Sequence, residues 1–154
     1  MSAVVIGVGN PFRRDDGIGP ALAARISEVN LPGVTVITSD GEPSRLLDAW
    51  SGAELAVVVD AIRQDGGVAG QLHRYAVTDS PTVGWAPTGS ASTHGLGIDE
   101  AIHLAQVMDL MPVRLVVFAV EAADIGYGEH LSQPVSASLP ELIEIVLAEL
   151  RSGT

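Results

Sequence analysis

Neither cysteine nor lysine occurs in this sequence of 154 residues, and all eight basic residues are arginines. Without cysteine, the chain can form no disulfide, thiolate metal site, iron–sulfur cluster or cysteine nucleophile. Without lysine, it has no Walker-type phosphate loop and no Schiff-base lysine. The groups that remain for chemistry are carboxylates, histidines, hydroxyl groups and metal ions held by oxygen or nitrogen ligands.

Aromatic residues and positive charge are also scarce. Aromatics make up only 4% of a chain that is 47% hydrophobic, so the core must be mostly aliphatic. The formal net charge of -11 argues against nucleic acid or an anionic membrane as partner, because both repel an acidic surface. The longest apolar run, residues 115–120, is far too short to span a membrane. No targeting segment is recognisable, and we expect a cytoplasmic protein.

Short β-branched runs alternate with helical patterns along the chain. We expect buried strands at residues 4–8, 34–37, 55–59 and 114–120, and an edge or antiparallel strand at 71–77. Helical patterns cover residues 18–29, 44–50, 96–108 and 138–150. A capping box, Ser138-Leu139-Pro140-Glu141, should open the last helix. This pattern predicts a single α/β domain over residues 1–154, with a mostly parallel, twisted sheet of about five strands and helices on both faces.

Four carboxylates follow the predicted strands, and they are Asp16, Asp40, Asp60 and Glu121. The carboxyl ends of parallel strands share one edge of a sheet, where ligands bind, so these acids should meet there. A bound cation would relieve their mutual repulsion. Asp60 is the clearest case, since a charge directly after a buried strand costs free energy unless it is compensated. A turn or cap role is equally plausible for Asp40, and a structural ion pair is at least as plausible for Glu121.

His94 lies among small residues just before a predicted helix, where a loop could deliver it as a ligand. Two carboxylates and one imidazole suit zinc, nickel or manganese better than copper(I). His73 and His103 fall within predicted elements, where a structural role is expected. No H-E-x-x-H helix and no Gly-x-Ser-x-Gly elbow occurs. Phe12 stands where a dinucleotide fingerprint needs its third glycine, so we expect no bound nucleotide.

Residues 7–19, GVGNPFRRDDGIG, resemble the opening motif of the [NiFe]-hydrogenase maturation endopeptidases. Asp40-Gly41 resembles the end of that family's second strand, and residues 57–61 resemble the end of its third. Residues 92–96 resemble its histidine loop. Glu121 and residues 126–135 resemble its C-terminal pattern. The resemblance covers nearly the whole chain in the family's order, with one departure at Glu42, where a second glycine is common.

This resemblance implies a peptidase that removes a C-terminal extension from the hydrogenase large-subunit precursor after nickel insertion. By matching position, it implies Asp16, Asp60 and His94 as the residues that bind nickel, and Asp40 as an acid linked to activity. These four residues are therefore the expected catalytic set. The nickel is expected to arrive with the precursor, which is the expected protein partner, rather than to stay bound to the peptidase.

The residues themselves leave alternatives open. A metal could polarise the scissile carbonyl or activate a water molecule, with Asp40 or Glu121 as general base. The same ligands could serve a metal-dependent amidohydrolase or peptidase that keeps its own zinc. They could equally serve a nickel-binding module without catalysis.

Overall fold

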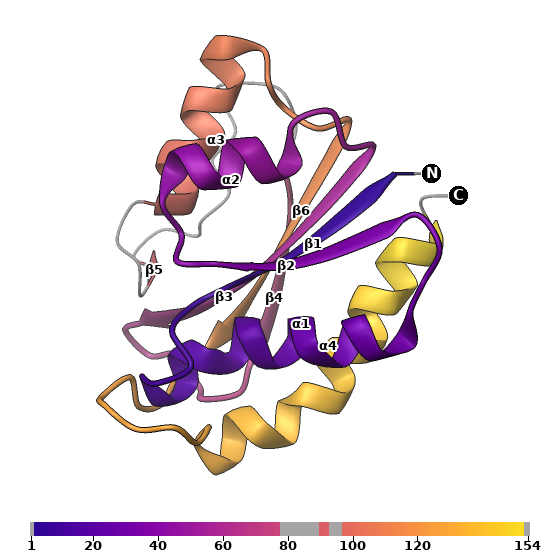
Figure 1. The fold of residues 1–154 in the computed structure, drawn as a ribbon. Coiled ribbons are helices and arrows are strands. Elements are labelled where there is room, and N and C mark those ends of the chain that lie inside the picture. The colour runs from indigo at the N-terminus through magenta and orange to yellow at the C-terminus, as the bar shows by residue number, and fades with distance from the viewer. Residues whose placement is uncertain (1, 78–89, 93–96, 153–154) are drawn as a thin grey trace.

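The computed structural model describes residues 2–77, 90–92 and 97–152 (Figure 1). Five strands form the main sheet, and they are β1 (Ala3–Val8), β2 (Val34–Ser39), β3 (Leu55–Gln64), β4 (Leu72–Val77) and β6 (Arg114–Glu121). Their order across the sheet is β2-β1-β3-β6-β4. The first four in this order are parallel, and β4 runs antiparallel to β6. The mostly parallel sheet of about five strands and the antiparallel strand near residues 71–77 are therefore confirmed.

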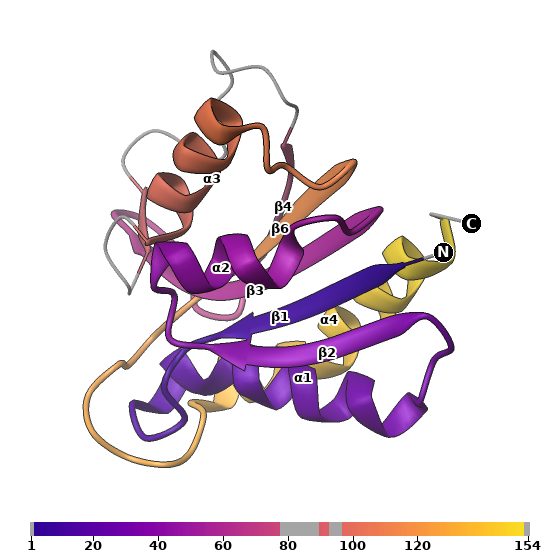
Figure 2. The same ribbon diagram turned by 45° about the horizontal axis from the view of Figure 1, so that its top comes forward.

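Helices cover both faces of this twisted sheet, as expected (Figures 1 and 2). One face carries α1 (Ile18–Val29) and α4 (Gln133–Ser152), and the other carries α2 (Pro43–Trp50) and α3 (Gly97–Met108). Alternate residues of β3 enter opposite cores: Val57 packs with α1 and α4, whereas Val58 packs with α2 and α3. Because both faces are buried, the strands read as continuous apolar runs.

Two elements depart from the expected bounds. β3 extends to Gln64, because its last residues pair with the short antiparallel strand β5 (Ser90–Ser92). α4 begins at Gln133, so the predicted capping box is wrong: Ser138 lies inside the helix, where its Oγ donates a hydrogen bond of 2.7 Å to the carbonyl oxygen of Val135. Pro140 is tolerated within the helix because both it and Ser136, whose carbonyl would face the missing N–H, are exposed to water.

The sheet edge at the carboxyl ends of β1, β2 and β3 gathers the opening motif of the chain. A 3₁₀ turn, η1 (Arg14–Gly17), connects β1 to α1 and contacts β3. Gly7 and Gly19 let α1 lie directly on β1: a Cβ added to Gly7 would come within 2.1 Å of the carbonyl oxygen of Gly19. No helix in the described part of the chain has the length and apolar character that a membrane crossing requires.

Candidate active site

Asp60 is buried within β3, with 0% of its surface exposed. It lies opposite Ala119 of β6, one residue beyond the last pairing of β3 with β1, Val59 with Gly7. One oxygen of its carboxylate, Oδ1, accepts a hydrogen bond of 2.8 Å from the N–H of Ala61. The sequence therefore brings a carboxylate into the interior at the point where the neighbouring strand ends.

Asp16 is the second buried acid at this edge, with 1% of its surface exposed. It belongs to η1, and its Oδ2 accepts a hydrogen bond of 2.9 Å from the N–H of Asn10, two residues beyond the end of β1. Gly9 makes this close approach possible: an added Cβ would lie 1.8 Å from the carbonyl oxygen of Asp16, and its φ of +148° favours glycine.

Asp40 follows β2, and its environment differs because its side chain is 60% exposed. Its Oδ1 accepts a hydrogen bond of 3.1 Å from the N–H of Glu42, and its Oδ2 lies 2.6 Å from Nη1 of Arg45. The N–H of Glu42, and then the positive charge of Arg45, lower the pKa of Asp40 below its usual value. Asp40 is therefore a carboxylate at neutral pH and a weak base.

Glu42, the departure from the family pattern, caps α2. Its carboxylate accepts hydrogen bonds from the N–H of Arg45, at 3.2 Å, and from the hydroxyl of Ser44. The bonds from Ser44 lower the pKa of Glu42, with a smaller contribution from Arg45. Glu42 thus begins the helix that holds Arg45 beside Asp40.

An open pocket of about 790 Å³ joins the opening motif to β2 and α2. The residues that line it are Gly9, Asn10, Pro11, Phe12, Arg13, Asp16, Pro20, Ile37, Thr38, Ser39, Asp40 and Arg45. The pocket thus brings together Asp16 and Asp40, and Asp60 lies outside this lining. A space of this size can hold several residues of an extended peptide next to both carboxylates.

His94 lies outside the described residues. The described chain on either side of it belongs to the same edge of the sheet: Ser92 pairs with Ile62 of β3, and a Cβ added to Gly97 would lie 2.4 Å from the carbonyl oxygen of Gly41. Within residues 2–77, 90–92 and 97–152, no group of three or more His, Asp or Glu side chains could hold a metal ion. The predicted trio includes His94 and remains a prediction.

Glu121 forms a structural pair, one of the two roles that its position in the sequence allowed. It is buried, and its Oε1 lies 3.1 Å from Nε2 of His73 on β4. Gly67 accommodates the carboxylate, because an added Cβ there would come within 2.4 Å of Oε2 of Glu121. His73 also stacks on Tyr75, with ring centroids 6.2 Å apart. The partner of Glu121 therefore lies on the antiparallel edge strand, away from the pocket lining.

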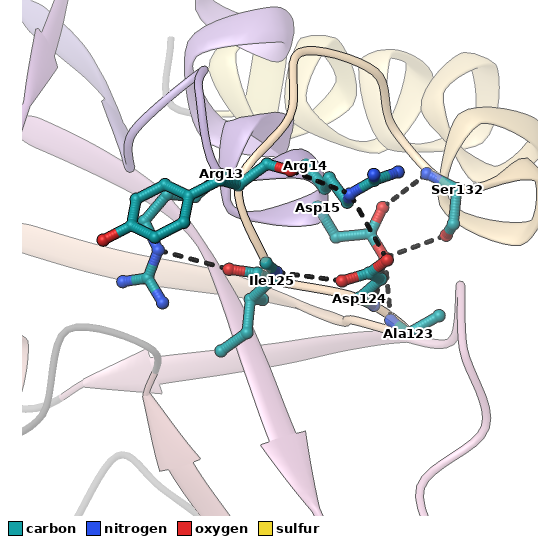
Figure 3. A network of polar contacts seen from close by, with 9 residues as sticks. Arg13, Arg14, Asp15, Ala123, Asp124, Ile125 and Ser132 are labelled. Atoms are coloured by element: carbon teal, nitrogen blue, oxygen red, sulfur yellow. Dashed lines mark hydrogen bonds and ion pairs between the residues drawn. The ribbon is translucent and has the colours of Figure 1, made fainter.

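Asp15 is a buried acid whose importance the sequence did not reveal (Figure 3). Its Oδ2 accepts hydrogen bonds from the N–H groups of Ala123 and Asp124, at 2.8 and 2.9 Å, and from the hydroxyl of Ser132, at 2.8 Å. Its Oδ1 accepts a fourth, of 2.7 Å, from the N–H of Ser132. Asp15 thus fastens the loop between β6 and α4 to the opening motif.

Two arginines of the same motif reach the same loop. The Nε of Arg13 donates to the carbonyl oxygen of Ile125 at 3.2 Å, and the Nε of Arg14 donates to that of Tyr127 at 3.3 Å. Arg14 also pairs with Asp124 at 3.4 Å. The sequence shows two adjacent acids and, far along the chain, a polar loop. No local pattern indicates which of the two carboxylates contacts that loop.

The fold is shared with hydrogenase maturation peptidases of known structure. The hydrogenase maturating endopeptidase HybD from E. coli has a TM-score of 0.80 at 22% identity, with 99% of this chain and 93% of that chain covered. The [NiFe] hydrogenase maturation protease HybD from Thermococcus kodakarensis has a TM-score of 0.74 at 21% identity, with 96% and 98% covered. Identities this low establish the fold alone.

The sequence establishes the family. The model of the hydrogenase maturation protease family matches residues 19–149, and the chain belongs to this family. The hydrogenase expression/formation protein HupD from Rhodobacter capsulatus is 28% identical over 152 residues, which cover 97% of this chain and 71% of that protein. The resemblance found in the opening motif is thereby confirmed, and the chain is a peptidase of hydrogenase maturation.

Proposed function

We propose that this peptidase removes the C-terminal extension of a [NiFe]-hydrogenase large-subunit precursor after nickel has been inserted. One observation carries the proposal: two carboxylates, Asp16 and Asp60, are buried on adjacent elements at the carboxyl edge of the sheet. Two carboxylates buried this close together repel each other when both are ionised, and a divalent cation, here the nickel of the substrate, would offset that repulsion.

In this proposal Asp16, Asp60 and His94 bind the nickel while the precursor is docked. Carboxylate oxygens and an imidazole nitrogen suit nickel, and they compete less strongly for it than thiolates would. The placement of Ser92 beside Ile62, and of Gly97 beside Gly41, supports His94 as the third ligand, because both flanking segments belong to this edge. The nickel leaves with the processed subunit and is part of the substrate.

Asp40 is the residue that we assign to the attacking water. It lines the same pocket as Asp16, whereas Glu121 already pairs with His73. Because the pKa of Asp40 is lowered, its carboxylate is ionised at neutral pH and can accept a hydrogen bond from water next to the scissile carbonyl. Hydrolysis then adds that water to the carbonyl carbon and releases the extension with a new amino terminus.

The partner in this proposal is a protein, which the net charge of -11 favours over nucleic acid or an anionic membrane. We also propose that processing takes place in the cytoplasm, which fractionation of the producing cells would test.

The decisive experiment incubates the protein with nickel-loaded and nickel-free precursors and measures the mass that each loses. We expect cleavage of the loaded precursor only. Asp60→Asn and His94→Ala should each slow processing by more than the about 10- to 100-fold that is typical when only a hydrogen-bond partner of a metal ligand is lost. Asp48→Asn, an exposed acid on α2, is the matched control and should process normally.

The other outcomes are equally informative. Cleavage that is independent of nickel, together with stoichiometric zinc in the purified protein, would identify a zinc peptidase. Nickel binding by calorimetry without any cleavage would identify a nickel-binding module. Full activity of His94→Ala would remove this residue from the proposed ligand set. A thermal unfolding scan of each variant separates loss of function from loss of fold.

A further inference from the structure

Two arginines line the pocket that contains Asp16 and Asp40. Arg13 comes from the segment after β1, and Arg45 comes from α2, so the two guanidinium groups belong to separate walls. The chain has only eight basic residues and a net charge of -11. Two of those eight line this one pocket, together with the acids Asp16 and Asp40, so the pocket can bind groups of either sign.

Arg45 can exchange its present partner. It pairs with Asp40 at 2.6 Å, but the two side chains are 68% and 60% exposed, so water screens the attraction and the pair contributes little to stability. A guanidinium carries five N–H donors, and the contact with Asp40 uses Nη1. The remaining donors can bind a second carboxylate, or Arg45 can turn from Asp40 to that carboxylate.

Arg13 is held in place without a carboxylate. Its Nε donates to the carbonyl oxygen of Ile125, which fixes the side chain at the pocket and leaves both terminal nitrogens as donors. In the part of the chain that the structure describes, no acidic side chain forms an ion pair with Arg13. Asp40 pairs with Arg45, whereas the terminal nitrogens of Arg13 remain available as donors to a ligand.

The remaining lining suits an extended peptide. Pro11, Phe12, Pro20 and Ile37 supply apolar surface, and the Phe12 side chain is 61% exposed in a protein with very few aromatics. An exposed aromatic ring beside two guanidinium groups can contact an apolar side chain while the arginines bind a neighbouring carboxylate. An uncharged peptide would offer no carboxylate to the remaining N–H donors of these arginines.

We propose that this pocket binds the extension of the precursor, and that Arg13 and Arg45 together bind a carboxylate of that extension. This inference rests on the proposed function and names the chemistry that the site selects. The carboxylate is either an Asp or Glu side chain of the extension or its free C-terminus, which share the same chemistry. Arg13 and Arg45 are specificity residues in this arrangement, and the bond is cut beside Asp40.

The test measures wild-type and variant enzymes on each of three nickel-loaded precursors. The first is the natural precursor, the second has every Asp and Glu of its extension changed to Asn and Gln, and the third ends in a C-terminal amide. Processing rates give kcat/KM for the wild type, for Arg13→Gln, for Arg45→Gln and for the double variant. Arg25→Gln, an exposed arginine on α1 outside the pocket lining, is the matched control.

We expect the wild type to lose about tenfold in kcat/KM with whichever substrate lacks the bound carboxylate, as for loss of one charge-assisted hydrogen-bonded pair. The double variant should lose a similar factor in kcat/KM on the natural precursor. On the substrate that lacks the bound carboxylate, it should lose almost nothing more. The loss should fall mainly on KM, because the arginines act in binding. Comparison of kcat/KM for the precursor with a C-terminal amide and for the precursor with Asn and Gln in its extension identifies which carboxylate is bound.

The inference is overturned if the wild type processes all three substrates at one rate. It is also overturned if the double variant is impaired by the same factor on the natural precursor and on whichever substrate the wild type processes more slowly, since the arginines would then act only on the fold or on Asp40. Failure of the proposed function looks different: the wild type itself would cut none of the three precursors.

Discussion

Two regions of this molecule contain short arginine–carboxylate pairs with opposite degrees of burial. Between β4, β6 and α4, Glu149 lies 2.8 Å from Nε of Arg74 and 2.7 Å from Nη2 of Arg114, and its side chain is only 7% exposed. In the pocket, the pair of Asp40 with Arg45 is slightly shorter, at 2.6 Å, but Asp40 is 60% exposed. Distance alone therefore does not separate the two regions.

Burial separates them. A buried carboxylate has given up its water, and without its cations it would carry an uncompensated charge in the interior. Arg74, and then Arg114, lower the pKa of Glu149 against the opposing effect of burial. An exposed carboxylate keeps its water whether or not an arginine is present. The Glu149 pair thus fixes α4 to the sheet, whereas the water-exposed Asp40 pair can separate at little cost in free energy.

The strongest test of this contrast removes both arginines from the buried acid. Arg74→Gln with Arg114→Gln should lower the free energy of unfolding by about 3 kcal/mol, the size expected when a buried ion pair loses one side. Urea unfolding at pH 7 measures it, with Arg25→Gln as a control that should change stability by less than about 0.5 kcal/mol. A loss below about 1 kcal/mol would mean that Glu149 is solvated after all.

The same pair should also produce an acid-dependent loss of stability. The pKa of Glu149 is lowered in the folded state, so its contribution is fully present above the ordinary value of 4.5 and disappears as the pH falls through the lowered value. Unfolding free energy followed from pH 7 down should therefore fall less steeply below pH 4.5 in the double variant than in the wild type.

A substitution of Asp15 tests whether a buried carboxylate requires an arginine partner. This acid is fully buried and accepts its four hydrogen bonds from N–H groups and one hydroxyl. Asp15→Asn keeps one acceptor oxygen and turns an amide toward an N–H donor, which should cost about 2 kcal/mol in urea unfolding. Glu129→Gln, an exposed acid of the same loop, is the control. A neutral result for Asp15→Asn would show that the loop holds without its charge.

The sheet and its ligand-binding edge were predictable because they follow from local patterns. The apolar run before Asp60 had to be a buried strand, and a parallel sheet brings the ends of such strands to one edge. The motif at residues 7–19 indicated the family, which the match over residues 19–149 confirms.

Contacts between residues far apart in the chain could not be predicted from the sequence. Asp15 and Asp16 are adjacent, yet a 3₁₀ turn separates neighbouring side chains by about 120°, so one bonds to the loop after β6 and the other to Asn10. Glu121 finds His73 on an antiparallel strand that no spacing connects to it. The capping box at Ser138 failed because burial of Val135 extends α4 toward its start, and packing overrode a local signal.

The smallest effect on stability is expected at the exposed pair of Asp40 with Arg45. This prediction separates the two regions most clearly. Arg45→Gln should change the unfolding free energy by less than about 0.5 kcal/mol, although its pair with Asp40 is the shortest of the three. The pKa of Asp40, followed by carbon NMR of its carboxyl group, should rise only part of the way to its usual value. The N–H of Glu42 is the main cause of the lowering and remains in place. A full return of the pKa, or a stability loss like that at Glu149, would show that Arg45 is committed to Asp40 and has no capacity for a substrate carboxylate.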